Sequence, residues 1–175
     1  MSEQLDESRR LTALRRLMVL DSSAETAYDD ITRLASQTFG APISLISLID
    51  EDRQWFKSRV GLEMQETPRD WSFCSHAIEQ PDEVLVVRDA QLDPRFRNNP
   101  MVTGSPHIRF YAGAPLVTAT GEAIGSLCVI DSKPRDIDPA KLAELQFLAA
   151  QVVAMMQKRA EFTGLFEPGR DDAAA

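Results

Sequence analysis

The sequence predicts an α+β domain with one central antiparallel sheet of five to six strands, and with N-terminal helices and a long C-terminal helix packed on one face. Three observations lead to this prediction. Helical periodicity occurs at the two ends of the chain, strand-like segments lie between them, and most of these segments form pairs joined by short turns. Short turns join antiparallel strands, whereas parallel strands need a crossover between them. We therefore expect α+β order rather than alternating βαβ units.

Two helices are expected before the first strand. Apolar residues recur every three to four positions between residues 11 and 18, which is typical of an amphipathic helix. Ser22 and Glu25 have the spacing of a capping box, which predicts the start of a second helix. Its apolar face runs through residues 27–39 and stops at Gly40.

The strands are indicated by a change of period from about 3.6 to two. Residues 43–49 are apolar on both faces, which predicts a central strand. After the acidic turn at residues 50–52, residues 54–60 alternate again and complete a hairpin. Residues 110–117 and 123–130 predict a second hairpin, with Gly121 in its turn.

Residues 61–106 are less regular than the rest of the chain. A short helix is expected at 73–78 and a strand at 84–87, followed by a stretch from 89 to 106 that three prolines interrupt. An irregular segment of this length inside a compact domain is usually a binding loop or lid. We therefore expect the functional site there.

The last predicted element is a long helix that begins with Asp138 as N-cap and Pro139 at the first helical position. The whole chain is read as a flexible N-terminus at 1–8, one domain at 9–160 and a loose tail at 161–175.

Net charge and hydropathy indicate which classes of partner the chain does not bind. The net charge of −8 disfavours binding to nucleic acid or to anionic lipid. The longest apolar stretch, residues 42–49, is far shorter than the roughly 20 residues of a membrane helix, and the first residues do not resemble a signal peptide. We expect a cytoplasmic protein with no membrane partner.

The two cysteines, Cys74 and Cys128, are far apart in the sequence and are predicted to be buried free thiols. Cys74 and His76 resemble a nucleophile and its base, but residues two apart on a helix point in different directions. With Asp89, the two histidines could supply three metal ligands, yet no close-spaced ligand pair supports this. No metal site is expected.

The chain resembles the GAF family from about residue 11 to 158. Five segments carry the likeness, and they stand in the family's order: 45–57 (LISLIDEDRQWFK), 72–78 (SFCSHAI), 93–96 (DPRF), 110–116 (FYAGAPL) and 125–131 (GSLCVID). GAF domains of this type occur in bacterial signalling proteins such as histidine kinases and diguanylate cyclases. The resemblance implies a sensory domain, although a fold alone does not specify a ligand.

Specialised branches of the family demand particular residues. Members that attach a bilin use a cysteine where this chain has Ser105–His107, so no covalent bilin is expected. Members that bind cyclic nucleotides often carry an Asn-Lys pair where this chain has Arg97–Asn98, and Arg95 or Arg97 could still hold a phosphate. The free methionine-R-sulfoxide reductases keep their catalytic cysteines at other positions. We therefore expect no enzymatic activity.

Aromatic and polar residues around the irregular segment are candidates for a ligand pocket, because such pockets are largely apolar with a few polar groups. The predicted wall consists of Trp71, Phe73, Cys74, His76, Phe96, His107, Phe110 and Tyr111, with Arg95 or Arg109 for an anionic group. The same aromatic residues could instead form only a core beneath the loop.

The function predicted from the sequence is a bacterial sensory domain that binds an unidentified small ligand noncovalently. Its terminal helices would relay the event, pairing in a homodimer and passing the signal to an output protein or domain. Two alternatives remain open: a thiol-dependent enzyme similar to free methionine sulfoxide reductase, and a ligand-free dimerisation module. The chain could be a whole protein or the front of a longer one.

Overall fold

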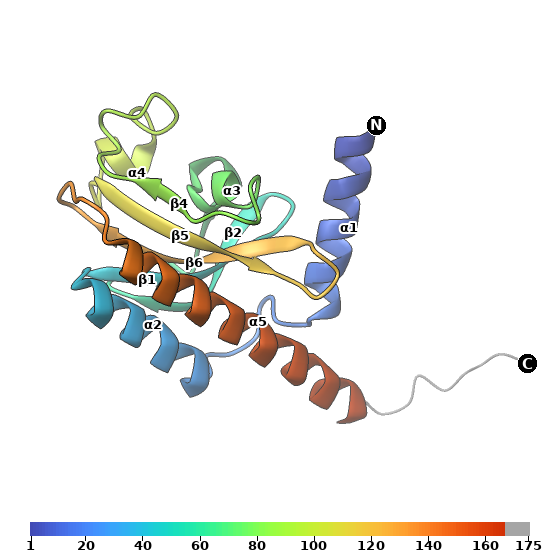
Figure 1. The fold of residues 1–175 in the computed structure, drawn as a ribbon. Coiled ribbons are helices and arrows are strands. Elements are labelled where there is room, and N and C mark those ends of the chain that lie inside the picture. The colour runs from blue at the N-terminus through green and yellow to red at the C-terminus, as the bar shows by residue number, and fades with distance from the viewer. Residues whose placement is uncertain (167–175) are drawn as a thin grey trace, which may run out of the picture.

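The structure, a computed structural model, describes residues 1–166 and contains a six-stranded sheet that is covered on both faces (Figure 1). Its elements, in chain order, are α1 (Ser2–Arg16), α2 (Thr26–Phe39), β1 (Ile43–Ile49), β2 (Arg53–Val60), β3 (Glu66–Pro68), the 3-10 turn η1 (Arg69–Trp71), α3 (Cys74–Ala77), β4 (Leu85–Val87), α4 (Pro100–Thr103), β5 (Phe110–Val117), β6 (Ala123–Asp131) and α5 (Pro139–Phe166).

The strand order is β3-β2-β1-β6-β5-β4, and every neighbouring pair is antiparallel. All seven residues of β1 are buried, so the prediction of a central strand is confirmed. On one side Leu45 lies opposite Arg59 of β2, and on the other it lies opposite Cys128 of β6. The predicted sheet of five to six strands is confirmed, with the short β3 added at one edge where a loop was expected.

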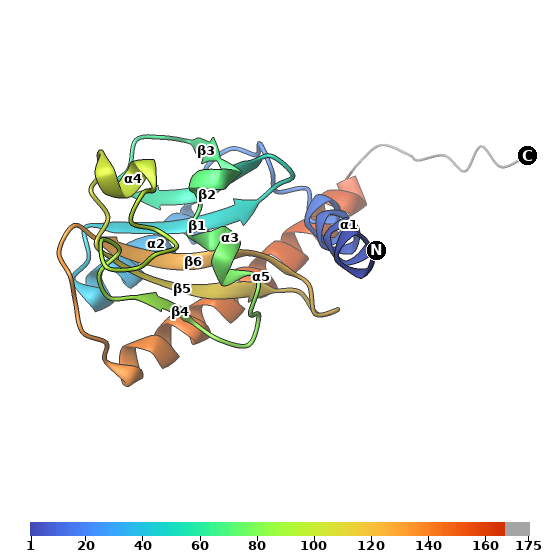
Figure 2. The same ribbon diagram turned by 90° about the horizontal axis from the view of Figure 1, so that it is seen from above.

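Helices α2 and α5 cover one face of the sheet, as predicted (Figures 1 and 2). Between them and the strands lies an apolar core centred on side chains such as Leu127, Val152 and Met156. Helix α1 does not share this face: it lies at one end of the sheet, beside the β5–β6 turn. Its buried Arg10 donates a hydrogen bond of 2.7 Å to the carbonyl oxygen of Ile49.

The opposite face is covered by residues 71–109, which we call the cover segment. This segment contains α3, the edge strand β4 and α4, joined by turns (Figure 2). Successive side chains of a strand point to opposite faces of the sheet, so the cover segment packs on every second residue of β1, β5 and β6. Leu45, Tyr111 and Cys128 point toward the cover segment, whereas Ile46, Ala112 and Leu127 belong to the core under α2 and α5.

Local signals at the element ends were only partly predictive. The left-handed Gly40 ends α2, and the Asp138 carboxylate accepts the amide hydrogen of Ala140 at 3.0 Å, both as expected. The prediction of a capping box at Ser22 is wrong, because α2 begins after Glu25. The Ser22 hydroxyl instead accepts a hydrogen bond from Lys57.

The ends of the chain are more helical than expected. Residues 2–8, predicted to be a flexible start, belong to α1. Helix α5 continues to Phe166 and so includes the first six residues of the predicted loose tail. The remainder of that tail, residues 167–175, lies outside the described residues.

Candidate functional site

A second apolar core lies between the sheet and the cover segment, and aromatic rings occupy its centre. The rings of Phe73 and Phe96 are stacked, with centroids 4.0 Å apart and planes at 7°. Tyr111, from β5, lies 5.2 Å from Phe73, and His76 meets the Phe96 ring edge-on at 4.9 Å. These contacts join α3 to the loop before α4, so they hold the cover segment closed over the sheet.

The space left inside this core is a cavity of about 10 Å³. Its lining combines sheet residues with residues of the cover segment: Leu45, Gln54, Phe56, Trp71, Phe73, Cys74, Met101, Ile108, Tyr111, Cys128 and Ile130. A volume of this size holds about one water molecule. The lining contains no aspartate, glutamate, lysine, arginine or histidine. Anything larger than a water-sized molecule therefore requires movement of the cover segment.

A group of hydrogen-bonded polar side chains is built into this apolar site. The amide oxygen of Gln54 accepts from Ser47 at 2.7 Å and from Ser72 at 2.9 Å, and its amide nitrogen donates to Thr67 at 3.0 Å. All four residues are at most 4% exposed. We call them the polar floor. Because buried polar groups must satisfy one another, this network fixes the rotamer of Gln54 at the cavity wall.

A second polar cluster surrounds the thiol of Cys74. Its Sγ accepts from the hydroxyl of Ser126 at 2.9 Å and from that of Tyr111 at 3.1 Å, and lies 4.0 Å from Sγ of Cys128. The position of Tyr111 depends on Gly113, since a Cβ at residue 113 would lie 2.2 Å from the tyrosine oxygen. The absence of that side chain lets the ring lie along β5 and reach the thiol.

The two thiols differ in acidity. Burial by itself raises the pKa of Cys74, but the Cys128 thiol and the hydroxyls of Ser126 and Tyr111 stabilise the thiolate and lower the pKa to about 6. Burial, followed by the neighbouring Cys74, raises the pKa of Cys128 well above its ordinary value. The pKa of Tyr111 is also raised, by burial first, so Tyr111 remains a donor.

The structure brings together five of the ten residues predicted for the pocket: Trp71, Phe73, Cys74, Phe96 and Tyr111 all belong to this second core. His76 lies at its margin against Phe96.

The other four residues do not line the cavity. Phe110 points to the opposite face, into the core under α2 and α5, because neighbouring residues of a strand alternate. His107 is exposed. Arg95 is exposed and pairs with Asp93 at 2.7 Å, and Arg109 donates to backbone carbonyl oxygens of the cover segment itself. The predicted arginine for an anionic group is therefore absent from this cavity.

Sequence reasoning missed the polar floor and Ser126. A signal was present, because Ser47 and Ser126 occupy inward positions of otherwise apolar strands, where a polar residue needs a buried partner. Gln54 and Ser72 had no such signal, since their burial depends on how β2 and the start of the cover segment meet.

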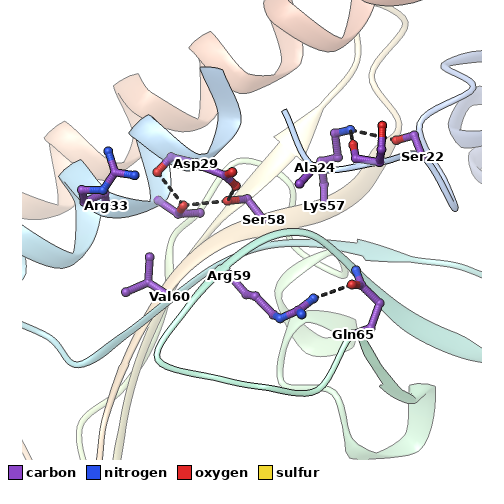
Figure 3. Close-up of a pocket in the computed structure, with 11 residues that line it drawn as sticks. Ser22, Ala24, Asp29, Arg33, Lys57, Ser58, Arg59, Val60 and Gln65 are labelled. Carbon is purple, nitrogen blue, oxygen red and sulfur yellow. Dashed lines mark hydrogen bonds between the residues drawn. The ribbon is translucent and has the colours of Figure 1, made fainter. Parts of the chain in front are cut away.

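A groove of about 450 Å³ lies on the other side of β2, next to α2 (Figure 3). Lys57 at its edge has a fully buried side chain, which contacts Glu25, the Ser22 hydroxyl at 2.8 Å and the Ser23 carbonyl oxygen at 2.7 Å. The hydroxyl of Ser58 bonds to α2 through Thr32 and Asp29 in the same groove. These polar groups of Lys57 and Ser58 thus tie β2 to the start of α2 and the turn before it.

Comparison with known proteins places these observations in a family. The sequence profile of the GAF domain matches residues 23–156. This chain belongs to the GAF family. The match includes the sheet, α2, most of α5 and the whole cover segment, so both cores of the domain are part of the family's fold.

A curated relative of this GAF domain is a cyclic di-GMP phosphodiesterase from Pseudomonas aeruginosa. It is 44% identical over 164 residues, which cover 93% of this chain but only 28% of the relative. The chain therefore spans little more than a quarter of that protein's length.

Solved structures confirm the fold. The GAF domain of an Acinetobacter phosphoenolpyruvate-protein phosphotransferase superposes with a TM-score of 0.64 and 18% identity, covering 96% of this chain and 98% of that one. A type II free methionine-R-sulfoxide reductase from Thermoplasma acidophilum superposes with a TM-score of 0.62 and 13% identity, covering 76% and 92%. At these identities the likeness concerns the fold alone.

Residues 1–166 contain neither a cluster of metal-ligating side chains nor a helix that could span a membrane. Within this range, no three histidine, cysteine, aspartate or glutamate side chains gather closely enough to hold a metal ion. None of the described helices has the length and apolar character that crossing a bilayer requires.

Proposed function

We propose that this GAF domain is a regulatory input domain of cyclic di-GMP signalling, and that it takes up a small, uncharged, hydrogen-bonding ligand noncovalently beneath the cover segment. The proposal of a ligand is based on the polar floor, whose Gln54 lines an otherwise largely apolar cavity. Replacing both partners of a neutral buried hydrogen bond by apolar groups of the same shape changes stability little, so packing alone does not require these groups. A cavity with no cationic side chain in its lining favours a neutral ligand over a phosphate or a carboxylate.

Uptake requires an opening movement, because the closed cavity holds only a water-sized molecule. The cover segment meets the sheet through the ring contact of Phe73 with Tyr111 and through the hydrogen bonds that link Ser72 to Gln54 and Cys74 to Ser126. If these contacts exchange between two arrangements, a ligand that binds one of them shifts the equilibrium.

The signal would leave through the helices. Glu25, at the start of α2, contacts Lys57 of β2 and accepts a hydrogen bond of 2.8 Å from Arg159 of α5. A shift of the sheet is thereby transmitted to the C-terminal helix. The curated relative supports an enzymatic output, since the protein named for cyclic di-GMP hydrolysis is much longer than this domain.

A second function, a ligand-free dimerisation module, is favoured by one observation: the nearly complete filling of the second core. In that case the polar floor would serve only to specify the packing of the cover segment, and a homodimer formed by the terminal helices would be the functional unit.

Native mass spectrometry of the full chain, purified from its own host, tests the proposal. We expect a noncovalently bound small molecule on the wild type and on Gln80→Leu, where the glutamine is exposed, and none on Gln54→Leu. Equal retention by the two variants would contradict a role for the polar floor.

An empty wild-type protein would remove the ligand from the proposal. Analytical ultracentrifugation of the same sample then tests the second function, since a dimerisation module must be a dimer at the concentration used and a monomer contradicts it.

A further inference from the structure

Cys74 and Cys128 belong to different elements of the fold but share one side of the cavity. Cys74 begins α3 in the cover segment, and Cys128 lies in β6, opposite Leu45 and Gly113 of the neighbouring strands. Their sulfur atoms are 4.0 Å apart, and both residues are at most 1% exposed. A disulfide requires an S–S distance of about 2.05 Å. A movement of about 2 Å by α3 toward the sheet would therefore join them.

We propose that Cys74 and Cys128 are an oxidisable dithiol, which hydrogen peroxide converts to an intrachain disulfide, with Cys74 as the attacking sulfur and Cys128 as the resolving one. This inference goes beyond the proposed function and does not depend on whether a ligand binds at the polar floor.

The roles of the two sulfurs follow from their surroundings. Cys74 receives hydrogen bonds from Ser126 and Tyr111, and such bonds stabilise a thiolate, which is the nucleophilic form of cysteine. Its lowered pKa agrees with this arrangement, whereas the raised pKa keeps Cys128 as a thiol. Cys74 is therefore the nucleophile that attacks the peroxide. Cys128 keeps its proton, which leaves with water when the disulfide forms.

The oxidant is selected by size. The cavity of about 10 Å³ is lined by both sulfur-bearing residues and, from the cover segment, also by Trp71, Phe73, Met101 and Ile108. Hydrogen peroxide is uncharged and little larger than water, so it can reach the thiolate with a small opening. A glutathione disulfide is far larger than this space and carries charges, so the closed cover segment excludes it.

The oxidation has two steps. The Cys74 thiolate attacks one oxygen of hydrogen peroxide, the O–O bond breaks, and the products are a sulfenic acid on Cys74 and a hydroxide, which takes up the proton that Cys74 had lost and becomes water. The Cys128 thiol then attacks the sulfenic sulfur, an S–S bond forms, and the sulfenic oxygen leaves as a second water with the Cys128 proton. The dithiol loses two electrons and the peroxide gains them.

Oxidation would act on the cover segment. Closing the sulfur distance pulls α3 onto β6 and removes the thiolate that Ser126 and Tyr111 now contact. Because Phe73 is the residue before Cys74 and stacks on Phe96, the movement also disturbs the ring pair that closes the cavity. The disulfide is thus placed to change the same segment that the proposed ligand would move.

The test exposes the full chain to hydrogen peroxide, alkylates the remaining thiols under denaturing conditions and measures the intact mass. We expect the wild type to lose both free thiols and the mass of two hydrogen atoms, as a monomeric species. Retention of both thiols, under conditions that oxidise free cysteine, would overturn the proposal. So would disulfides that form only between chains.

Dimedone labelling, which traps sulfenic acid, assigns the roles of the sulfurs. Cys128→Ser should accumulate the label on Cys74, whereas Cys74→Ser should show none on Cys128. Labelling of both positions to the same extent would overturn the assignment. Circular dichroism melts confirm that the variants are folded, and the wild-type mass measurement needs no variant at all.

The pH profile of the peroxide reaction separates a tuned thiolate from an accidental contact. The wild-type rate should follow the thiolate of Cys74, with a midpoint of about 6. Losing one hydrogen bond to the thiolate raises its pKa by about one unit, so Tyr111→Phe should react about fivefold more slowly at pH 6. Tyr28→Phe is the matched control, because the Tyr28 hydroxyl is buried and has no hydrogen-bond partner among residues 1–166. Equal profiles for the two variants would contradict the role of Tyr111.

Discussion

Replacing Glu25 by glutamine should destabilise the domain by about 2 kcal/mol at pH 7, because it leaves a buried lysine without its counter-ion. The Lys57 side chain is 0% exposed and has three partners: the Glu25 carboxylate, the Ser22 hydroxyl and the Ser23 carbonyl oxygen. Removing one partner of a fully buried pair costs about 3–5 kcal/mol. Glu25 is itself 38% exposed and the glutamine oxygen can still accept a hydrogen bond, so we place the loss below that range.

The pH dependence of this contribution has a definite sign. Burial alone would raise the pKa of Glu25, but hydrogen bonds from Lys57 and Arg159 outweigh it, so the pKa in the folded protein lies below its ordinary value of 4.5. Such a group stabilises the fold fully above that ordinary value and loses its contribution as the pH falls through the lowered one. The difference between wild type and Glu25→Gln should therefore be constant near pH 7 and shrink below about pH 4.5.

Urea unfolding at pH 7 and at pH 3 measures both effects. With an m-value of about 2 kcal/mol per molar urea, a loss of about 2 kcal/mol lowers the unfolding midpoint by about 1 M. Asp30→Asn is the matched control on the same helix, because the Asp30–Arg33 pair is exposed and should contribute little. Equal midpoints for the two variants at pH 7 would refute the reasoning, as would a Glu25→Gln effect that is undiminished at pH 3.

Three further predictions concern close packing and charge. Gly125→Ala should lower the free energy of unfolding, measured in urea, by about 3 kcal/mol or more, because the new Cβ would lie 1.9 Å from the Ser47 carbonyl oxygen in the centre of the sheet. A loss below about 1 kcal/mol would contradict this contact. Gly113→Ala should cost less, about 1–2 kcal/mol, since the Tyr111 ring can turn away from the new Cβ. It should also raise the pH midpoint of Cys74 oxidation, and an unchanged midpoint would count against the proposed role of the glycine. Hydrogen bonds from Arg10 and Arg69 lower the pKa of Glu7 to about 2, although burial opposes them. Glu7→Gln should therefore remove a stabilising contribution that is present above about pH 4.5 and disappears toward pH 2. Melting curves of wild type and variant that differ equally at pH 2 and pH 7 would refute this.

The order and type of the main elements could be predicted from local sequence, because periodicity records which side of each element meets other protein atoms. Three local signals were each sufficient for the element they predicted: the mostly apolar run of β1, the paired strands before and after the irregular segment, and Asp138 at the start of α5. The short strand β3 and helix α4 were missed, since three or four residues are too few to establish a period.

The element ends show where local signals compete with distant contacts. Ser22 has the residue type and spacing of a helix cap, but its hydroxyl accepts a hydrogen bond from Lys57, which is 35 residues further along the chain. The burial of that lysine is likewise tertiary: a bulge in the pairing of β1 with β2, between Ile46 and Ser47, interrupts the alternation of β2 that the sequence predicted. No local pattern contains this information.

For the site, the sequence alone indicated the family, the covering role of the irregular segment and four of the residues that line the cavity. It could not place Phe110, because the choice between two adjacent aromatic residues depends on which face of β5 meets the cover segment. Nor could it relate Cys74 to Cys128, whose sulfur atoms are brought to 4.0 Å only when α3 is laid across β6. Sequence patterns record the environment of each element, whereas the meeting of side chains from distant elements depends on register and packing, and these exist only in the folded chain.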